Sequence, residues 1–231
     1  ELPNNILHNL NAFTFSAYIY ADQNQEGYSN IIQQDPGNSQ LMLIRFQNGM
    51  SIFKFVLDLH SGPNNGLEIL APVPNINQWY NIAMTYDGQS MIAYINGIPI
   101  DSGFISGSLS AFNAITYIGN WQLQEDFDGQ IDNVQIWDFA LNQSEIQNYM
   151  SCPLSGLESG LIGAWDFEDN SNSNIATDIS GNGNNGLING YGATYNSNVP
   201  SQSCNLTTTN GCDSVIAINL TIMICGCTDS L

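Results

Sequence analysis

A succession of short apolar segments, each ended by a turn sequence, is the feature that most constrains the fold. Asn-Gly or Asp-Gly pairs stand at positions 48–49, 87–88 and 96–97, and these pairs are favoured in two-residue β-hairpin loops. We expect strands at 13–20, 31–32, 41–46, 51–59, 79–86, 91–95, 116–119 and 130–137. Strands this short and closely spaced predict an all-β sandwich and not βαβ units.

One short helix is expected at residues 142–150, where apolar residues stand at 141, 146, 149 and 150. Asn142 is a suitable N-cap, and Glu145 follows three residues later. This spacing is that of a capping box, in which each residue bonds the backbone N–H of the other.

The charge of the chain excludes several partners. Asp and Glu number 21 against 2 Lys and Arg, for a formal net charge of −19. Nucleic acids and anionic membrane surfaces are bound by clusters of Lys and Arg, so both are excluded. No apolar run of 18 residues is present, so no segment is expected to span a bilayer. A surface this acidic makes calcium a natural partner, although the acidity can equally serve solubility.

The later part of the chain reads as two further units. Residues 152–204 hold a strand at 161–167, a turn at 180–186 and short strands at 187–188 and 193–195. Residues 205–231 hold a Thr- and Asn-rich linker and then a strand at 215–222 that is apolar on both faces. Such a strand is not stable alone and must pair with another.

All five cysteines lie after residue 151. Their spacing does not match a zinc finger, so disulfides in an oxidising compartment are the better interpretation. We expect Cys152 to pair with Cys204, and a Cys204–Cys212 bridge is the competing pair. The odd count leaves at least one thiol for a partner elsewhere.

Five sequence blocks resemble laminin-G-like domains with a concanavalin A-like jelly-roll fold. They lie, in the family's order, at 15–19, 78–88, 93–97, 117–119 and 127–137, and Ala140-Leu141 leads into the short helix. The opening strand of such domains is similar to residues 161–168, and its Ser-Gly-Asn-Gly turn is similar to residues 180–183. These elements therefore come late in the chain.

Two arrangements explain this order. The late strands fold back and complete one sandwich, which we prefer, or residues 152–204 begin a second copy. The preferred arrangement predicts a laminin-G-like sandwich at 1–204 and a linker with a C-terminal strand at 205–231. Because the chain begins at Glu1-Leu2-Pro3, we also expect it to be a processed or trimmed piece.

The tail at 207–222 resembles repeats in surface adhesins secreted by Bacteroidetes-type bacteria. This resemblance implies an extracellular or cell-surface location on a bacterium. Asp213-Ser214-Val215 and Asp229-Ser230-Leu231 are similar to the O-glycosylation sites of such bacteria, which makes Ser214 and Ser230 candidate glycosylation sites.

The resemblance also implies a structural calcium, because relatives of this fold often hold one. Asp132 lies in a segment that resembles the metal-contacting strand, and Asp166, Glu168 and Asp178 are its candidate partners, together with the carbonyls of 181–183. Calcium binds six to eight oxygen ligands of these kinds. In the alternative, Asp132 and Asp178 bond backbone N–H groups in turns.

A candidate glycan-binding set lies at Trp121, Glu125, Asp126 and Asp128. A tryptophan ring can stack on a sugar while neighbouring carboxylates bond its hydroxyls. The alternative is a solvated acidic loop with Trp121 packed at the edge of the core. Tyr28 has the same two interpretations.

Catalysis is not expected, because neither histidine stands in a motif and the acidic residues after 165 lack the spacing used by glycosidases of this fold. Two functions remain. The first is a non-enzymatic adhesion or glycan-binding module of a bacterial surface protein. The alternative is a structural protomer of an extracellular filament, in which residues 213–224 are donated to a neighbouring copy of the same protein.

Overall fold

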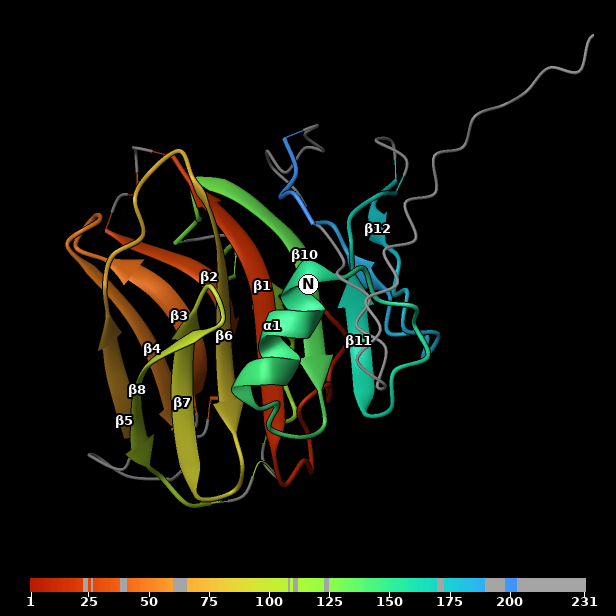
Figure 1. Ribbon diagram of the computed structural model, residues 1–231, viewed down its shortest axis with the longest axis horizontal. Coiled ribbons are helices and arrows are strands. Elements are labelled where there is room, and N and C mark those ends of the chain that lie inside the picture. The colour runs from red at the N-terminus through yellow and green to blue at the C-terminus, as the bar shows by residue number, and fades with distance from the viewer. Residues whose placement is uncertain are drawn as a thin grey trace, which may run out of the picture.

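The structure is a computed structural model of the 231-residue chain. It describes residues 1–22, 25, 27–37, 41–59, 66–107, 109, 112–122, 125–169, 173–189 and 198–202. Two antiparallel sheets form the body of the molecule, and one short helix lies in front of the larger sheet (Figure 1). The predicted all-β sandwich with a single short helix is confirmed.

The larger sheet has six strands in the order β11-β10-β1-β6-β7-β8. They are β11 (Leu161–Trp165), β10 (Gly129–Trp137), β1 (Phe13–Ala21), β6 (Trp79–Tyr86), β7 (Ser90–Ile95) and β8 (Ile98–Phe104). The smaller sheet has five strands in the order β5-β4-β3-β2-β9. They are β5 (Gly66–Ala71), β4 (Ile52–Asp58), β3 (Leu41–Gln47), β2 (Tyr28–Gln34) and β9 (Thr116–Ile118). A two-stranded ribbon adds β12 (Ile175–Ala176) and β13 (Gly186–Leu187).

The predicted hairpins form where the Asn-Gly and Asp-Gly pairs stand. They join β3 to β4, β6 to β7 and β7 to β8. Asn96 and Gly97 have φ of 51° and 68°, values that Asn and Gly adopt more readily than other residues. The sequence of these turns thus determines where each strand reverses.

The hydrophobic core lies between the two sheets, and β1 shows how the sequence builds it. Phe13, Phe15, Ala17 and Ile19 are buried in the core cluster. Alternate residues of a strand point to opposite faces, so the even-numbered residues of β1 lie on the outer face of the six-stranded sheet. This alternation leaves both outer faces of the sandwich for polar side chains and covering elements.

The helix α1 (Gln143–Ser151) covers part of the outer face of the six-stranded sheet (Figure 1). Asn142 caps it, and Glu145 bonds back to the Asn142 backbone, so the predicted capping box is confirmed. The Tyr149 ring lies 4.5 Å from the Trp137 ring, centroid to centroid. Tyr18 Oη donates to the carbonyl of Met150 at 2.7 Å.

The late strands lie against both sheets. β11 pairs with β10 at the edge of the six-stranded sheet. Glu1 and Leu187 exchange two hydrogen bonds of 2.8 Å, and Leu2 pairs with Thr116 in β9. The division of the chain at residue 204 stays a prediction.

Several predicted features lie outside the described residues. They include the strand at 193–195, the linker and strand at 205–231, Cys204 and the candidate glycosylation sites Ser214 and Ser230. Strand donation by residues 213–224 therefore stays a prediction. Within the described part of the chain, no helix is long and apolar enough to cross a membrane.

Candidate functional site

Polar side chains gather on the outer face of the five-stranded sheet. Met42, Ile44 and Phe46 of β3 point into the core, so Arg45 points outward. Arg45 stands opposite Asn30 of β2 on one side and opposite Lys54 of β4 on the other. The register of three strands thus places an amide, a guanidinium and an ammonium group in one row.

The loop at 119–128 reaches this row and is anchored at both ends. Gly119 donates its N–H to Ile31 in β2 at 2.9 Å, and Phe127 donates its N–H to Gly119 at 2.8 Å. The Phe127 ring stacks on Phe46 with centroids 6.0 Å apart and an interplanar angle of 8°. The apolar anchor at Phe127 positions the acidic residue two places before it.

Glu125 is held firmly against the sheet. Asn30 Nδ2 donates to Glu125 Oε2 at 2.7 Å, and the Asn30 N–H donates to the Glu125 carbonyl at 3.0 Å. Arg45 lies at ion-pair distance, with 3.9 Å between its guanidinium nitrogen and Glu125 Oε2. A carboxylate and a guanidinium, both partly exposed, therefore lie side by side.

An aromatic surface adjoins this pair. Tyr28 is 43% exposed, and the Arg45 guanidinium lies 4.2 Å from the centroid of its ring in a cation–π contact. Trp121 is half-buried, and Asp126 and Asp128 are exposed. The structure thus brings Tyr28, Arg45 and Glu125 together; we call these three residues the Tyr28 surface.

Sequence reasoning named Glu125 and Tyr28 but missed Asn30, Gln33 and Arg45. Asn30 and Gln33 are buried on the outer face, and Asn30 Oδ1, Gln33 Oε1 and Arg45 Nε have no hydrogen-bond partner among the residues that the structure describes. Buried polar atoms without a partner are rare in proteins, and each one needs an explanation other than packing alone. Only the pairing of β2 with β3 reveals this cluster, because no sequence motif contains it.

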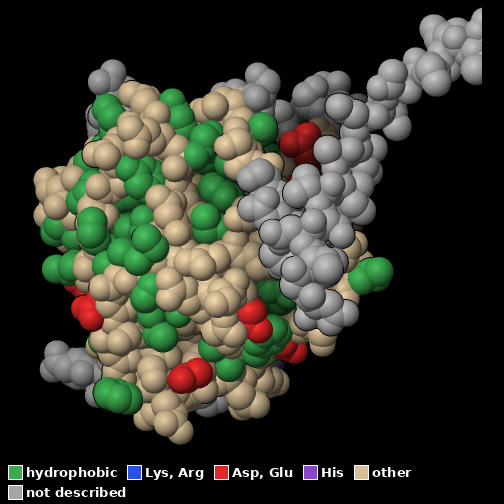
Figure 2. Space-filling model, viewed as in Figure 1, with side chains coloured by type: hydrophobic (Ala, Val, Ile, Leu, Met, Phe, Trp, Pro, Cys, Tyr) green, Lys and Arg blue, Asp and Glu red, His purple; other side chains and the backbone are tan. Residues whose placement is uncertain are grey.

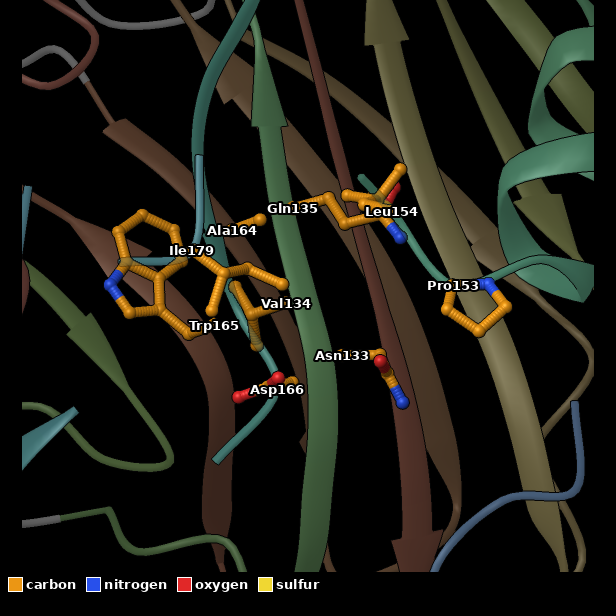
Figure 3. A pocket seen from close by; sticks show the side chains of 9 residues that line it. All are labelled: Asn133, Val134, Gln135, Pro153, Leu154, Ala164, Trp165, Asp166 and Ile179. Carbon is orange, nitrogen blue, oxygen red and sulfur yellow. The ribbon is translucent and has the colours of Figure 1, made fainter. Parts of the chain in front are cut away.

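Three of the four predicted metal ligands lie near one another. Asp132 is 7% exposed, and burial raises its pKa to about 6. The hydrogen bond from the Asn133 N–H lowers the pKa and offsets part of this rise. The negative charges of Glu168 and Asp166 raise the pKa further, as like charges do. Figure 3 shows a small pocket beside this cluster, lined among others by Asn133 and Asp166, with Pro153 on its far side.

Asp178 has a different role. Its Oδ1 accepts the N–H groups of Ala164 at 3.0 Å and Ser180 at 2.9 Å, and its Oδ2 accepts that of Asn184 at 2.9 Å. Burial raises the pKa of Asp178, but these hydrogen bonds outweigh it and the pKa is lowered. The carboxylate organises the turn after β11, as in our structural alternative.

Calcium binding stays a prediction. Among the described residues, no three His, Cys, Asp or Glu side chains converge as metal ligands do. Asp166 Oδ1 accepts the N–H of Glu168 at 3.2 Å, and Asp178 is committed to backbone amides. Cys152 is disulfide-bonded, but Cys204 lies outside the described residues, so the Cys152–Cys204 pairing also stays a prediction.

A family model for the concanavalin A-like lectin/glucanases superfamily matches residues 1–147. The chain belongs to this superfamily. The predicted laminin-G-like, concanavalin A-like resemblance is thereby confirmed, and the match includes the Tyr28 surface and the loop at 119–128.

Two solved structures share the superfamily fold with this chain. A protein of Bacteroides ovatus assigned as carbohydrate-binding has a TM-score of 0.61 and 16% identity, over 86% of this chain and 59% of its own. The sialidase module CBM40 of Ruminococcus gnavus, bound to α2,3-sialyllactose, has a TM-score of 0.51 and 13% identity, over 62% of this chain and 83% of its own. At these identities the likeness concerns the fold alone.

A curated relative matches a shorter stretch. Pappalysin-1 of Mus musculus is 32% identical over 78 residues, which is 32% of this chain. The chain covers 5% of the length of that protein. The similarity therefore concerns one part of a much longer polypeptide.

Proposed function

We propose that the chain is a non-enzymatic glycan-binding module that acts outside the cell, on the surface of a bacterium. The observation that carries this proposal is the Tyr28 surface, where an exposed aromatic ring adjoins an ion-paired Arg45 and Glu125. Sugar sites combine an apolar ring surface with a few fixed polar groups that set orientation.

The polar groups match the chemistry of a sugar hydroxyl. A guanidinium only donates hydrogen bonds and an ionised carboxylate only accepts them. A hydroxyl does both, so neighbouring hydroxyls of one ring can bond Arg45 and Glu125 together. Asn30 holds Glu125 with two hydrogen bonds, which lowers the entropy lost on binding.

The comparisons support the same proposal at the level of the fold. The carbohydrate-binding protein of Bacteroides ovatus and the CBM40 module share this sandwich. Both are binding proteins by name, and this supports a binding role without catalysis. The bacterial surface rests on the resemblance of the tail at 207–222, which lies outside the described residues.

A glycan array with the purified chain and the variant Tyr28→Ala tests the proposal. We expect the wild-type chain to bind a defined group of glycans and Tyr28→Ala to lose most of that binding, because the stacking surface is removed. Phe104→Ala is the matched control, since Phe104 is a 92% exposed aromatic residue on β8. Equal loss in both variants, or no glycan bound by the wild-type chain, would overturn the proposal.

A further inference from the structure

The chain holds its only two strong bases on one face of one sheet. Arg45 and Lys54 are the 2 Lys and Arg residues of a protein with a net charge of −19. They stand directly opposite each other on β3 and β4. Figure 2 shows the other side of the molecule, where red acidic side chains are visible and no blue side chain is.

Each base is already paired with a carboxylate. Lys54 Nζ lies 2.6 Å from Glu68 Oε2, and the Arg45 guanidinium lies 3.9 Å from Glu125 Oε2. The four residues Glu125, Arg45, Lys54 and Glu68 form a row of two positive and two negative charges across the sheet. We call this row the charge-balanced row; no net positive charge is left in it for an anionic ligand.

The Glu125 carboxylate also opposes the binding of anionic groups to the Arg45 guanidinium. An anionic sugar group that pairs with Arg45 must displace Glu125 or lie beside it. Displacement breaks the 2.7 Å bond from Asn30 Nδ2 to Glu125 Oε2, and it leaves a partly buried carboxylate unpaired. An anionic group beside Glu125 would place two negative charges next to each other, and such like-charge contacts at an interface are strongly unfavourable.

An uncharged sugar meets neither obstacle. Its hydroxyls can accept from Arg45 and donate to Glu125 without breaking the ion pair, and its ring can lie on the exposed Tyr28. The overall charge of −19 also slows the approach of anionic chains, whereas neutral chains are unaffected.

We propose that the Tyr28 surface selects uncharged glycans and rejects those that carry a carboxylate or sulfate at the bound residue. This inference rests on the proposed glycan-binding function and names the class of glycan. It differs from the CBM40 module of Ruminococcus gnavus, which shares the fold and is bound to a sialylated sugar.

The test compares matched pairs of glycans, each a neutral oligosaccharide and its sialylated or sulfated derivative, by calorimetry with the full chain. We expect each bound neutral member to bind at least about tenfold more tightly than its charged derivative. Glu125→Gln should lower the ratio of the affinity for the neutral glycan to the affinity for its charged derivative. The variant removes the negative charge beside Arg45 and retains a side-chain oxygen that can accept from Asn30. Asp101→Asn removes an exposed carboxylate on β8 and is the control, for which the ratio should stay unchanged.

The outcomes separate the two proposals. If a charged glycan binds as tightly as its neutral partner or more tightly, and Arg45→Gln abolishes that binding, the inference is overturned while glycan binding stands. If Glu125→Gln leaves the ratio of neutral to charged glycan affinity unchanged, the inference that the Glu125 charge excludes anionic glycans is wrong. Binding of no glycan at all overturns the proposed function itself.

Discussion

Tyr18 of β1 stands directly opposite Asp132 of β10 on the outer face of the six-stranded sheet. The Asp132 carboxylate disfavours the charged form of Tyr18. The pKa of Tyr18 is raised by burial and by the Asp132 charge, and the pKa of Asp132 is raised by burial to about 6. A bulge between the two strands, with Asn133 at a φ of 49°, places Asp132 on this face.

We expect Asp132→Asn to stabilise the protein above pH 6. Because the folded pKa of about 6 exceeds the ordinary value of 3.8, the Asp132 contribution is favourable below the ordinary value and is lost as the pH rises through 6. Asparagine keeps an oxygen for the 2.7 Å bond from the Asn133 N–H. We predict a gain of about 1–2 kcal/mol at pH 8 that vanishes near pH 4, measured by urea unfolding with a chelator present. A gain independent of pH would contradict the charge argument.

Most of the sandwich could be predicted from sequence because its signals are local. The Asn-Gly turn at 96–97 and the capping residues Asn142 and Glu145 act within a few positions of themselves. β8 was missed because Pro99, Asp101 and Gly103 interrupt its pattern and most of its residues are exposed. Edge strands carry little alternation, since neither face is fully buried.

The site could be predicted only in part, because its contacts are long-range. Glu125 meets Asn30 across 95 positions of the chain. The β2–β3 pairing also contains a bulge between Asn30 and Ile32, and a one-residue change of register moves every following side chain to the other face. The loop could be recognised from its composition, whereas Arg45 could be placed beside it only from the sheet.

We expect Asp178→Ala to destabilise the fold by about 2–4 kcal/mol, because three backbone N–H groups lose a charged acceptor. The change in melting temperature should be the same in calcium and in chelator, since both oxygens of Asp178 already bond amides. The same comparison of melting temperatures in calcium and in chelator, made on the wild-type chain, tests the calcium prediction. An unchanged melting temperature would contradict that prediction. A loss in Asp178→Ala seen only with calcium would instead restore Asp178 as a ligand.

The capping box of α1 gives a third prediction. Asn142→Ala removes the acceptor for the Glu145 N–H, a bond of 3.1 Å, and we expect a loss of about 1 kcal/mol in unfolding free energy. Asn142→Asp is the conservative control and should retain the cap. Because α1 packs on Trp137 through Tyr149, near-ultraviolet circular dichroism should change in Asn142→Ala if the helix frays, and an unchanged stability would show that packing alone holds it.

The ion pair of Lys54 and Glu68 is asymmetric, and the two halves should not cost the same to remove. The Lys54 side chain is 11% exposed, and that of Glu68 is 47% exposed. Glu68→Ala leaves a mostly buried ammonium unpaired, which is costly, whereas Lys54→Met leaves a carboxylate that water can solvate and fills the same space with an apolar chain.

We predict a loss of about 1–2 kcal/mol for Glu68→Ala and less than about 0.5 kcal/mol for Lys54→Met. The double variant should be no less stable than Glu68→Ala alone, because it contains no stranded charge. Urea unfolding at one pH and salt concentration measures both losses. Equal losses in the two single variants would contradict this prediction, because they would mean that the unpaired Lys54 ammonium is as well solvated as the unpaired Glu68 carboxylate.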